Sequence, residues 1–98
     1  MAVNLKAPDK LLPVSGVTLS TSAAPVRYKD RDDMVLLSLP TGTQLAAVFT
    51  QNAFCAAPVT IARQHIVACA EPRALLINSG NANAGTGDPG LSDAQACC

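Results

Sequence analysis

A dense block of glycines and asparagines is the part of the sequence with the clearest potential for chemistry. It follows the apolar run 74–78 and carries three amide side chains, at Asn78, Asn81 and Asn83. An amide offers donors and an acceptor, and Asn enters the left-handed backbone region more readily than most residues. The glycines between them allow close approach of the backbone to a ligand. These three asparagines are therefore candidates for lining a polar site, and bracing the turns of the loop is an equally good interpretation.

The same block spells a dinucleotide-binding motif, an interpretation that we reject. Residues 85–90 read Gly-Thr-Gly-Asp-Pro-Gly, which matches G-x-G-x-x-G between a strand and a helix. The predicted strand ends at Asn78, well before Gly85, whereas the glycines of the motif belong in the turn that leaves the strand. Asp88 would also place a carboxylate where the pyrophosphate should bind. We expect no nicotinamide or flavin cofactor, and keep a small nucleotide-binding domain only as a third hypothesis.

The other reactive side chains do not form a recognisable catalytic set. His65 is the only histidine and lies near the end of a predicted helix, where a surface role is commoner than general-base catalysis. Cys55 has no readable histidine partner and is expected to be inert. Ser79 and Thr86 are expected to satisfy backbone groups, because the nucleophile motif G-x-S-x-G is absent. We therefore assign no catalytic residue.

The cysteine spacing predicts no metal site. The chain contains neither a C-x-x-C pair nor a zinc-type set with His65, although it has four cysteines: Cys55, Cys69, Cys97 and Cys98. The first ten residues lack the pattern of a secretory or mitochondrial leader, which predicts a cytoplasmic protein. Reduced thiols are the expected state in that compartment.

Charge and composition exclude two classes of function. Seven Lys and Arg residues balance seven Asp and Glu residues, so the attraction that dominates nucleic-acid binding is missing. The longest apolar runs are far shorter than the about 20 residues needed to cross a bilayer. Hydrophobic residues make up 49% of the chain, but only two Phe and one Tyr supply aromatic area, which predicts a thin core for an isolated domain.

The elements that must position these residues follow an α+β order with a largely antiparallel or mixed sheet. Apolar residues alternate with hydroxyl residues over 16–22, which predicts a half-buried strand. Residues 34–39 and 45–49 predict a hairpin around the turn-forming Pro40-Thr-Gly42. Helical spacing from Val59 to Ile66 predicts a helix with Pro58 in its first turn.

Further segments complete this prediction. After the helix, Ala74–Asn78 is expected to be a strand, and Ser92 is expected to cap a helix that starts at Asp93. Fewer than two helical turns then fit before Cys98, so we expect the chain to stop short of its natural end. Residues 1–13 are expected to be an extended lead-in to one domain at 14–98. The charged run 29–33 mixes signs and predicts a solvated loop.

Three passages resemble the N-terminal part of the ornithine acetyltransferase family. They are residues 46–59, 77–87 and 90–94, and the likeness runs from about Gly16 to the last residue. The Asn-Ala-Asn-Ala sequence after Asn-Ser-Gly is the most specific of these marks. The resemblance implies a layered α/β/β/α sandwich, of which this chain would be an N-terminal piece of the α chain.

The resemblance also implies acetyl transfer in arginine biosynthesis. Members of the family move an acetyl group from N-acetylornithine to glutamate, and some also use acetyl-CoA as a co-substrate. Their precursor cleaves itself into α and β chains, and a new N-terminal Thr then carries the acetyl group. A Thr-Gly pair stabilises the oxyanion. That Thr and that pair correspond to sequence beyond Cys98, since Thr86-Gly87 belongs to the Gly/Asn block, so the isolated chain is expected to be inactive.

Two hypotheses of different classes therefore stand. In the first, the chain is a fragment of a glutamate N-acetyltransferase, with the rest of the α chain and the β chain as partners in a dimer of αβ pairs. In the alternative, the chain is a non-catalytic interaction module that docks a partner chain by its sheet edges.

Overall fold

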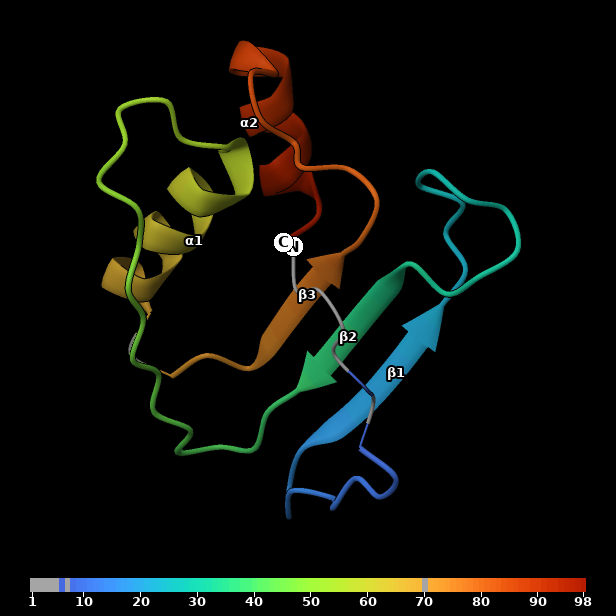
Figure 1. Ribbon diagram of the computed structural model, residues 1–98. Coiled ribbons are helices and arrows are strands. Elements are labelled where there is room, and N and C mark those ends of the chain that lie inside the picture. The colour runs from blue at the N-terminus through green and yellow to red at the C-terminus, as the bar shows by residue number, and fades with distance from the viewer. Residues whose placement is uncertain (1–5, 7, 70) are drawn as a thin grey trace.

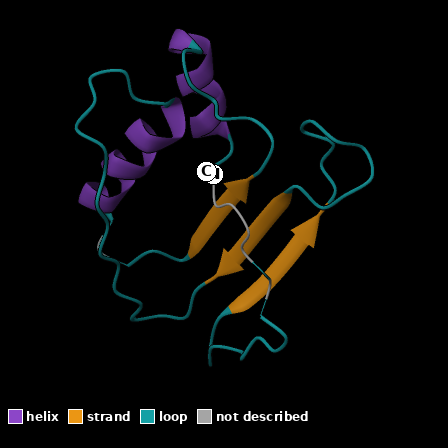
Figure 2. Ribbon diagram, viewed as in Figure 1, coloured by secondary structure: helices purple, strands orange, loops and turns teal. Residues whose placement is uncertain are grey.

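The fold is α+β, as the sequence predicts. The computed structural model describes residues 6, 8–69 and 71–98 (Figure 1). Its elements in chain order are β1 (Thr18–Ser22), β2 (Met34–Ser38), α1 (Ala57–Ala68), β3 (Ala74–Asn78) and α2 (Gly87–Ala96). The strands form one sheet and the two helices lie together beside it (Figure 2). In the predicted lead-in, residues 1–5 and 7 lie outside the described residues.

The sheet has the order β1-β2-β3, and both strand pairs are antiparallel. Residues that face each other across an antiparallel pair point to the same side of the sheet. One face therefore carries the row Leu19, Leu37 and Leu75, and the other carries the row Ser20, Leu36 and Leu76. Because β2 and β3 are apolar on both faces, they have the composition of strands that are covered on both sides.

The two helices pack on each other and not on the sheet. Pro58 lies in the first turn of α1, where its missing N–H costs no hydrogen bond. The only buried hydrophobic residues among those described are Ala57 and Ile61, both on α1. No Cα atom of a helix comes within 8 Å of a Cα atom of a strand. The described part of the chain therefore lacks the tight helix-on-sheet layer of a finished α+β domain.

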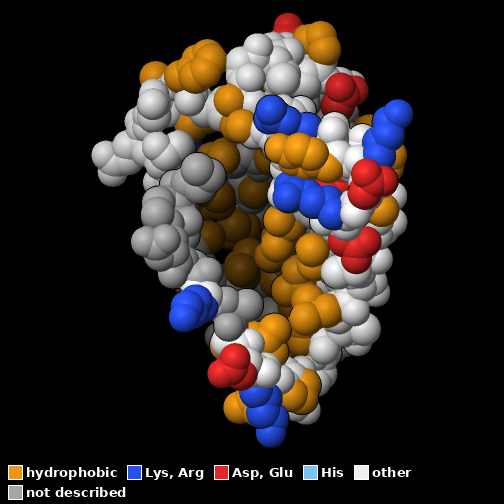
Figure 3. All heavy atoms as spheres, turned by 45° about the vertical axis from the view of Figure 1, so that its right-hand side comes forward, with side chains coloured by type: hydrophobic (Ala, Val, Ile, Leu, Met, Phe, Trp, Pro, Cys, Tyr) orange, Lys and Arg blue, Asp and Glu red, His pale blue; other side chains and the backbone are white. Residues whose placement is uncertain are grey.

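The thin core predicted from the composition is confirmed. The accessible surface is 8103 Å², whereas a compact protein of this mass exposes about 5,200 Å². The radius of gyration is 15.1 Å, compared with about 12.6 Å for a compact domain of this length. Hydrophobic side chains line a deep hollow on the face of the molecule that Figure 3 shows. Apolar surface that a compact domain would bury is therefore exposed in this chain.

Two predictions for the strands are wrong. Residues 45–49 form no strand, and β2 pairs with β1 and β3 instead. The predicted turn does form, with Thr43 donating its N–H to the carbonyl oxygen of Pro40 at 3.3 Å, but the chain then runs towards α1 with Val48 97% exposed. The strand at residues 18–22 is present but not half-buried, since all five of its residues are exposed and Leu19 is 65% exposed.

The start of the last helix is also wrong in the sequence prediction. The structure begins α2 at Gly87, with Thr86 as its N-cap residue, so that Ser92 lies inside the helix. Asp88 and Pro89 occupy the first turn, where a negative charge is favoured and a missing N–H costs nothing. Within the described residues, no helix has the length and apolar character to cross a membrane.

Candidate functional site

The three candidate asparagines come together at one end of the sheet. The side-chain amide of Asn78 donates to the carbonyl oxygen of Asn81 at 3.1 Å, and the amide of Asn81 donates to Oδ1 of Asn83 at 2.9 Å. The amide of Asn83 then donates back to Oδ1 of Asn78 at 3.1 Å. This asparagine cluster, defined as Asn78, Asn81 and Asn83, closes a ring of hydrogen bonds around the loop that leaves β3. The bracing interpretation accounts for these bonds; whether the cluster also lines a site stays a prediction.

The backbone of this loop needs the residue types that it has. Asn83 has φ 51°, a left-handed conformation that Asn tolerates better than most residues. Gly80 has φ 98°, and a side chain there would lie 3.0 Å from Cβ of Arg27. The carbonyl oxygen of Asn83 also accepts the N–H of Ala57 at 3.4 Å, which ties the loop to the start of α1. The Gly/Asn block therefore joins the sheet to the first helix.

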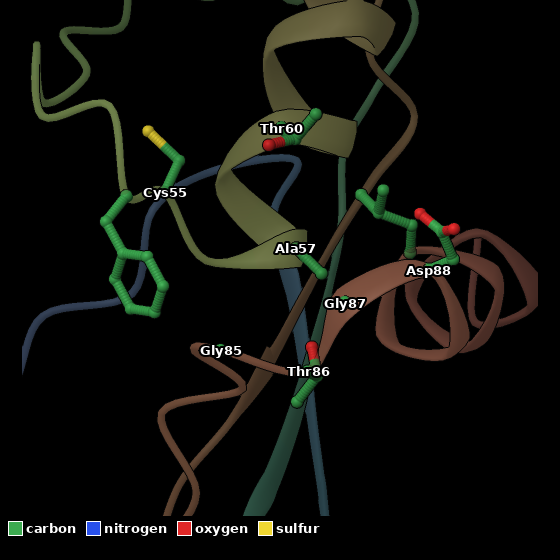
Figure 4. A pocket seen from close by; sticks show the side chains of 9 residues that line it. Cys55, Ala57, Thr60, Gly85, Thr86, Gly87 and Asp88 are labelled. Atoms are coloured by element: carbon green, nitrogen blue, oxygen red, sulfur yellow. The ribbon is translucent and has the colours of Figure 1, made fainter.

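A pocket of about 220 Å³ lies where the two helices begin. Figure 4 shows Ala57 and Thr60 of α1 near Gly87 and Asp88 of α2 and near Thr86, the N-cap residue of α2. The full lining consists of Phe54, Cys55, Ala57, Thr60, Gly85, Thr86, Gly87, Asp88 and Leu91. The carboxylate of Asp88 already supplies negative charge where the unpaired N–H groups of a helix start would attract an anion. The pocket is therefore suited to a neutral or weakly polar group.

Glycines shape this pocket by close packing. A side chain at Gly85 would meet the ring of Phe54 at 3.2 Å, and one at Gly90 would collide with Oγ1 of Thr86. Thr86 itself donates to the carbonyl oxygen of Asn83 at 3.4 Å. Gly87 and Gly90 lie in α2, and eight residues separate Asn78, the last residue of β3, from Gly87, the first residue of the helix. The block thus differs from a dinucleotide motif, whose glycines form a tight turn directly after the strand.

No hydrogen bond joins Cys55 and His65 in the described residues. The thiol of Cys55 donates to the carbonyl oxygen of Asn52 at 2.9 Å. His65 is exposed in the last turn of α1, as predicted, about 12 Å along the helix from Ala57 at 1.5 Å per residue. Ser79 donates its N–H to the carbonyl oxygen of Asp33. In the part of the chain that the structure describes, no group of three or more potential metal ligands occurs.

Asp33 is the residue that sequence reasoning missed. The prediction of a solvated loop holds for residues 29–32, which are exposed, but Asp33 is only 2% exposed. Its carboxylate accepts the backbone N–H of Ala24 at 2.7 Å and that of Val26 at 2.6 Å. These two donors lie in the loop between β1 and β2, so one carboxylate closes that loop. An Asp directly before a strand, with an irregular segment close upstream, was the available signal.

The electrostatics of Asp33 match its geometry. The backbone N–H of Ala24 has the largest effect and lowers the pKa of the Asp33 carboxyl below its ordinary value. Burial acts in the opposite direction, and the N–H groups of Val26, Arg27 and Asp33 itself lower the pKa further. Asp33 is therefore a negatively charged brace at the same end of the sheet as the asparagine cluster.

The chain matches one protein family over most of its length. The model of the ArgJ family matches residues 18–98. Among curated proteins, an arginine biosynthesis bifunctional protein ArgJ from Methylococcus capsulatus is 56% identical over 89 residues, covering 91% of this chain and 21% of that protein. The protein of the same name from Psychrobacter arcticus is 52% identical and covers 100% of this chain and 24% of that protein. The chain thus spans between a fifth and a quarter of these relatives.

Two solved structures share the fold. The crystal structure of the arginine biosynthesis bifunctional protein ArgJ from Bacillus halodurans matches with a TM-score of 0.75 and 31% identity. Ornithine acetyltransferase from Mycobacterium tuberculosis, complexed with ornithine, matches with a TM-score of 0.74 and 34% identity. In each case the match covers 84% of this chain and 42% of the solved chain.

Proposed function

Because the chain belongs to the ArgJ family, we propose that it is the N-terminal part of an acetyltransferase of arginine biosynthesis. The observation that carries this proposal is the shared fold with an ornithine acetyltransferase at 34% identity. The curated relatives, named for arginine biosynthesis, support the same assignment at 52–56% identity. The chain spans less than a quarter of those relatives, so the activity belongs to a longer polypeptide that contains this fold.

The proposed reaction moves an acetyl group from N-acetylornithine to glutamate. The acetyl group would pass through an ester on a Thr that lies outside these 98 residues, freed as an N-terminus when the precursor cleaves itself. Acetyl-CoA is a second proposed acetyl donor, used as a co-substrate and not as a bound cofactor. The proposed assembly is a dimer of αβ pairs. The cytoplasmic location stays a prediction of the sequence.

Within that enzyme, this chain would supply a scaffold and one polar wall of the site. In the pocket at the helix starts, Cys55 and Thr86 donate to backbone carbonyl oxygens and not to Asp88, whereas the asparagine cluster forms a hydrogen-bonded set of amides at the end of the sheet. Each side-chain amide uses one of its two N–H protons within the cluster, which leaves the other for a carboxylate or carbonyl of a substrate. We therefore propose that the asparagine cluster orients substrate and takes no part in covalent chemistry.

A chimaera tests the proposed activity. This chain would replace the matched segment of the M. capsulatus relative, and acetyl transfer from N-acetylornithine to glutamate would be measured. We expect a rate within about tenfold of the parent, a loss of at most about 1.4 kcal/mol of transition-state stabilisation, because the matched segments are 56% identical over 89 residues. The 98-residue chain alone should give no turnover. A chimaera that folds like its parent but transfers no acetyl group would contradict the proposal.

The alternative function, a non-catalytic docking module, is favoured by one observation: β3 is an edge strand, and no described strand pairs with its outer edge. It predicts that this chain binds the remaining part of the relative without restoring acetyl transfer. Co-expression of the two parts as separate polypeptides distinguishes the hypotheses, because turnover in the purified complex supports the enzyme and a stable inactive complex supports the module.

A further inference from the structure

Two loops meet at the end of the sheet where the asparagine cluster lies. Residues 23–33 join β1 to β2, and the Gly/Asn block leaves β3 at the same end of the sheet (Figure 1). The loops touch at Gly80, where an added Cβ would lie 3.0 Å from Cβ of Arg27 and 3.9 Å from its backbone N. Distances this short leave no space for a side chain between the two loops. Because Gly80 lies between Ser79 and Asn81, the loop between β1 and β2 limits where the Gly/Asn block can carry its asparagines.

Asp33 is hydrogen-bonded to both loops. Its Oδ1 accepts the N–H of Ala24 at 2.7 Å and its Oδ2 accepts that of Val26 at 2.6 Å, so the carboxylate holds the first loop just before its contact with Gly80. Its carbonyl oxygen accepts the N–H of Ser79 at 2.8 Å, which holds the second loop one residue before the same contact. The side chain and the main chain of one residue therefore fix the two segments that meet at Gly80.

A carboxylate suits this position better than an amide would. Each of its two oxygens accepts one backbone N–H, and both bonds are short, as expected of a charged acceptor. With Asn at this position, one side-chain atom would be an oxygen and the other an NH2 group, so a donor would face one of the two N–H groups in either orientation. Because Asp33 is only 2% exposed, little water is available to accept the N–H that loses its partner. Asp33→Asn should therefore release one of the two bonds that hold the loop.

We propose that Asp33 is a positioning residue, whose carboxylate holds the loop between β1 and β2 against Gly80 and thereby fixes the asparagine cluster in the orientation that meets substrate. The ring of hydrogen bonds fixes the three amides relative to one another. The bonds of Asp33 fix the loop that carries Asn81 and Asn83 relative to the sheet. Asp33 itself touches no substrate. The contact between the asparagine cluster and an amino-acid substrate rests on the proposed function, whereas the coupling between Asp33 and the cluster does not.

Amide hydrogen exchange in the chimaera with the M. capsulatus relative tests the coupling without an assay of activity. In Asp33→Asn we expect the backbone amide of Ser79 to exchange about tenfold faster, because the chain around Gly80 opens more often once the loop is looser. Asp32→Asn is the matched control, since Asp32 is exposed and bonds to Thr21, and it should leave this exchange rate unchanged. An unchanged rate at Ser79 in Asp33→Asn would overturn the proposal.

A kinetic test separates positioning from a general loss of stability. In the chimaera, Asp33→Asn should raise KM for glutamate or N-acetylornithine about three- to tenfold and change kcat by less than about twofold. Ile61→Val is the control, because it lowers stability by removing a buried methyl group from α1 and should leave both KM values unchanged. An equal rise of KM in the two variants would mean that Asp33 only stabilises the fold, against the proposal.

A double variant tests whether Asp33 acts through the asparagine cluster. If it does, Asp33→Asn combined with Asn81→Ala should raise KM by no more than about twofold beyond the larger single effect, since both changes disturb one unit. Single effects that multiply in the double variant would mean that the two residues act independently, and the proposal would be wrong. If the chimaera transfers no acetyl group, the exchange rate at Ser79 decides: faster exchange in Asp33→Asn then supports the positioning of the cluster and rejects only the proposed function.

Discussion

The end of β3 and the outer edge of the same strand differ in how many of their groups find partners within this chain. Where β3 ends, the polar corner, defined as the asparagine cluster together with Asp33 and the N–H groups of Ala24 and Val26, is closed by hydrogen bonds within the chain. Along the outer edge of β3, neither the backbone nor the apolar side chains find partners among the described residues. The polar groups of the chain are thus satisfied locally, whereas much of its apolar surface is exposed.

The difference follows from the sequence separation of the groups that must meet. The bonds of the polar corner join residues two to nine positions apart, so each forms with little loss of chain entropy. Covering an apolar sheet requires another layer or strand, and 98 residues with few aromatic side chains cannot supply it. A buried, unpaired polar group would be costly at any stage of folding, and no buried side-chain N or O atom in the described residues lacks a partner.

The largest expected effect comes from placing a charge on β3, the strand with exposed apolar side chains. Leu76→Asp in the chimaera should destabilise the protein by roughly 3–5 kcal/mol if the rest of the relative covers this apolar face, because the carboxylate would then be buried without a partner. Ser20→Asp is the control, since Ser20 lies on the same face two strands away and is exposed. Its expected effect is about 0.5 kcal/mol. Thermal midpoints measure both, and equal effects would mean that the two edges do not differ.

The substitution Asp33→Asn tests the polar corner. The neutral amide is a weaker acceptor for the N–H groups of Ala24 and Val26, so the loop between β1 and β2 should loosen. We expect the thermal midpoint of the chimaera to fall by about 5 °C. Asp32→Asn is the matched control, because Asp32 is exposed and bonds only to Thr21. A fall of the same size in both variants would show that the burial of Asp33 contributes nothing special.

The charge of Asp33 also predicts a pH dependence. Its pKa is lowered in the folded state, chiefly by the N–H of Ala24. The stabilisation is therefore fully present above about pH 3.9, the ordinary carboxyl pKa, and is lost as the pH falls through the lower folded value. Urea midpoints of the chimaera and of its Asp33→Asn variant should accordingly converge below about pH 4. A difference between them that stays constant down to pH 2 would argue against this origin.

The smallest expected effect lies in the asparagine cluster. Asn81→Ala removes the donor to Oδ1 of Asn83 and should cost about 0.5–1.5 kcal/mol of stability, since the site is exposed and water can replace the bond. If the asparagine cluster orients substrate, KM for glutamate or N-acetylornithine in the chimaera should rise with little change in kcat. A stability loss with unchanged KM would leave the bracing role alone.

Local patterns predicted what depends on near neighbours. The strand 74–78 and the helix after Pro58 were predictable because an apolar run and a helix-starting proline act within a few residues. The run 45–49 has the apolar composition of a strand, but no strand among the described residues pairs with it. The burial of Asp33 depends on a loop that returns nine residues later, which no periodicity encodes. The asparagines were recognised as a set, but their ring of bonds required the backbone of Asn83 in its left-handed conformation.

The free edge of β3 has a consequence for biosynthesis. An unpaired apolar strand is exposed to other nascent chains during synthesis, and a five-residue apolar strand is the kind of segment that aggregates. The polar Gly/Asn loop directly downstream would interrupt such pairing at Asn78, because glycines and asparagines are poor β-formers. The asparagine cluster would then act as a gatekeeper while the polypeptide is still being made.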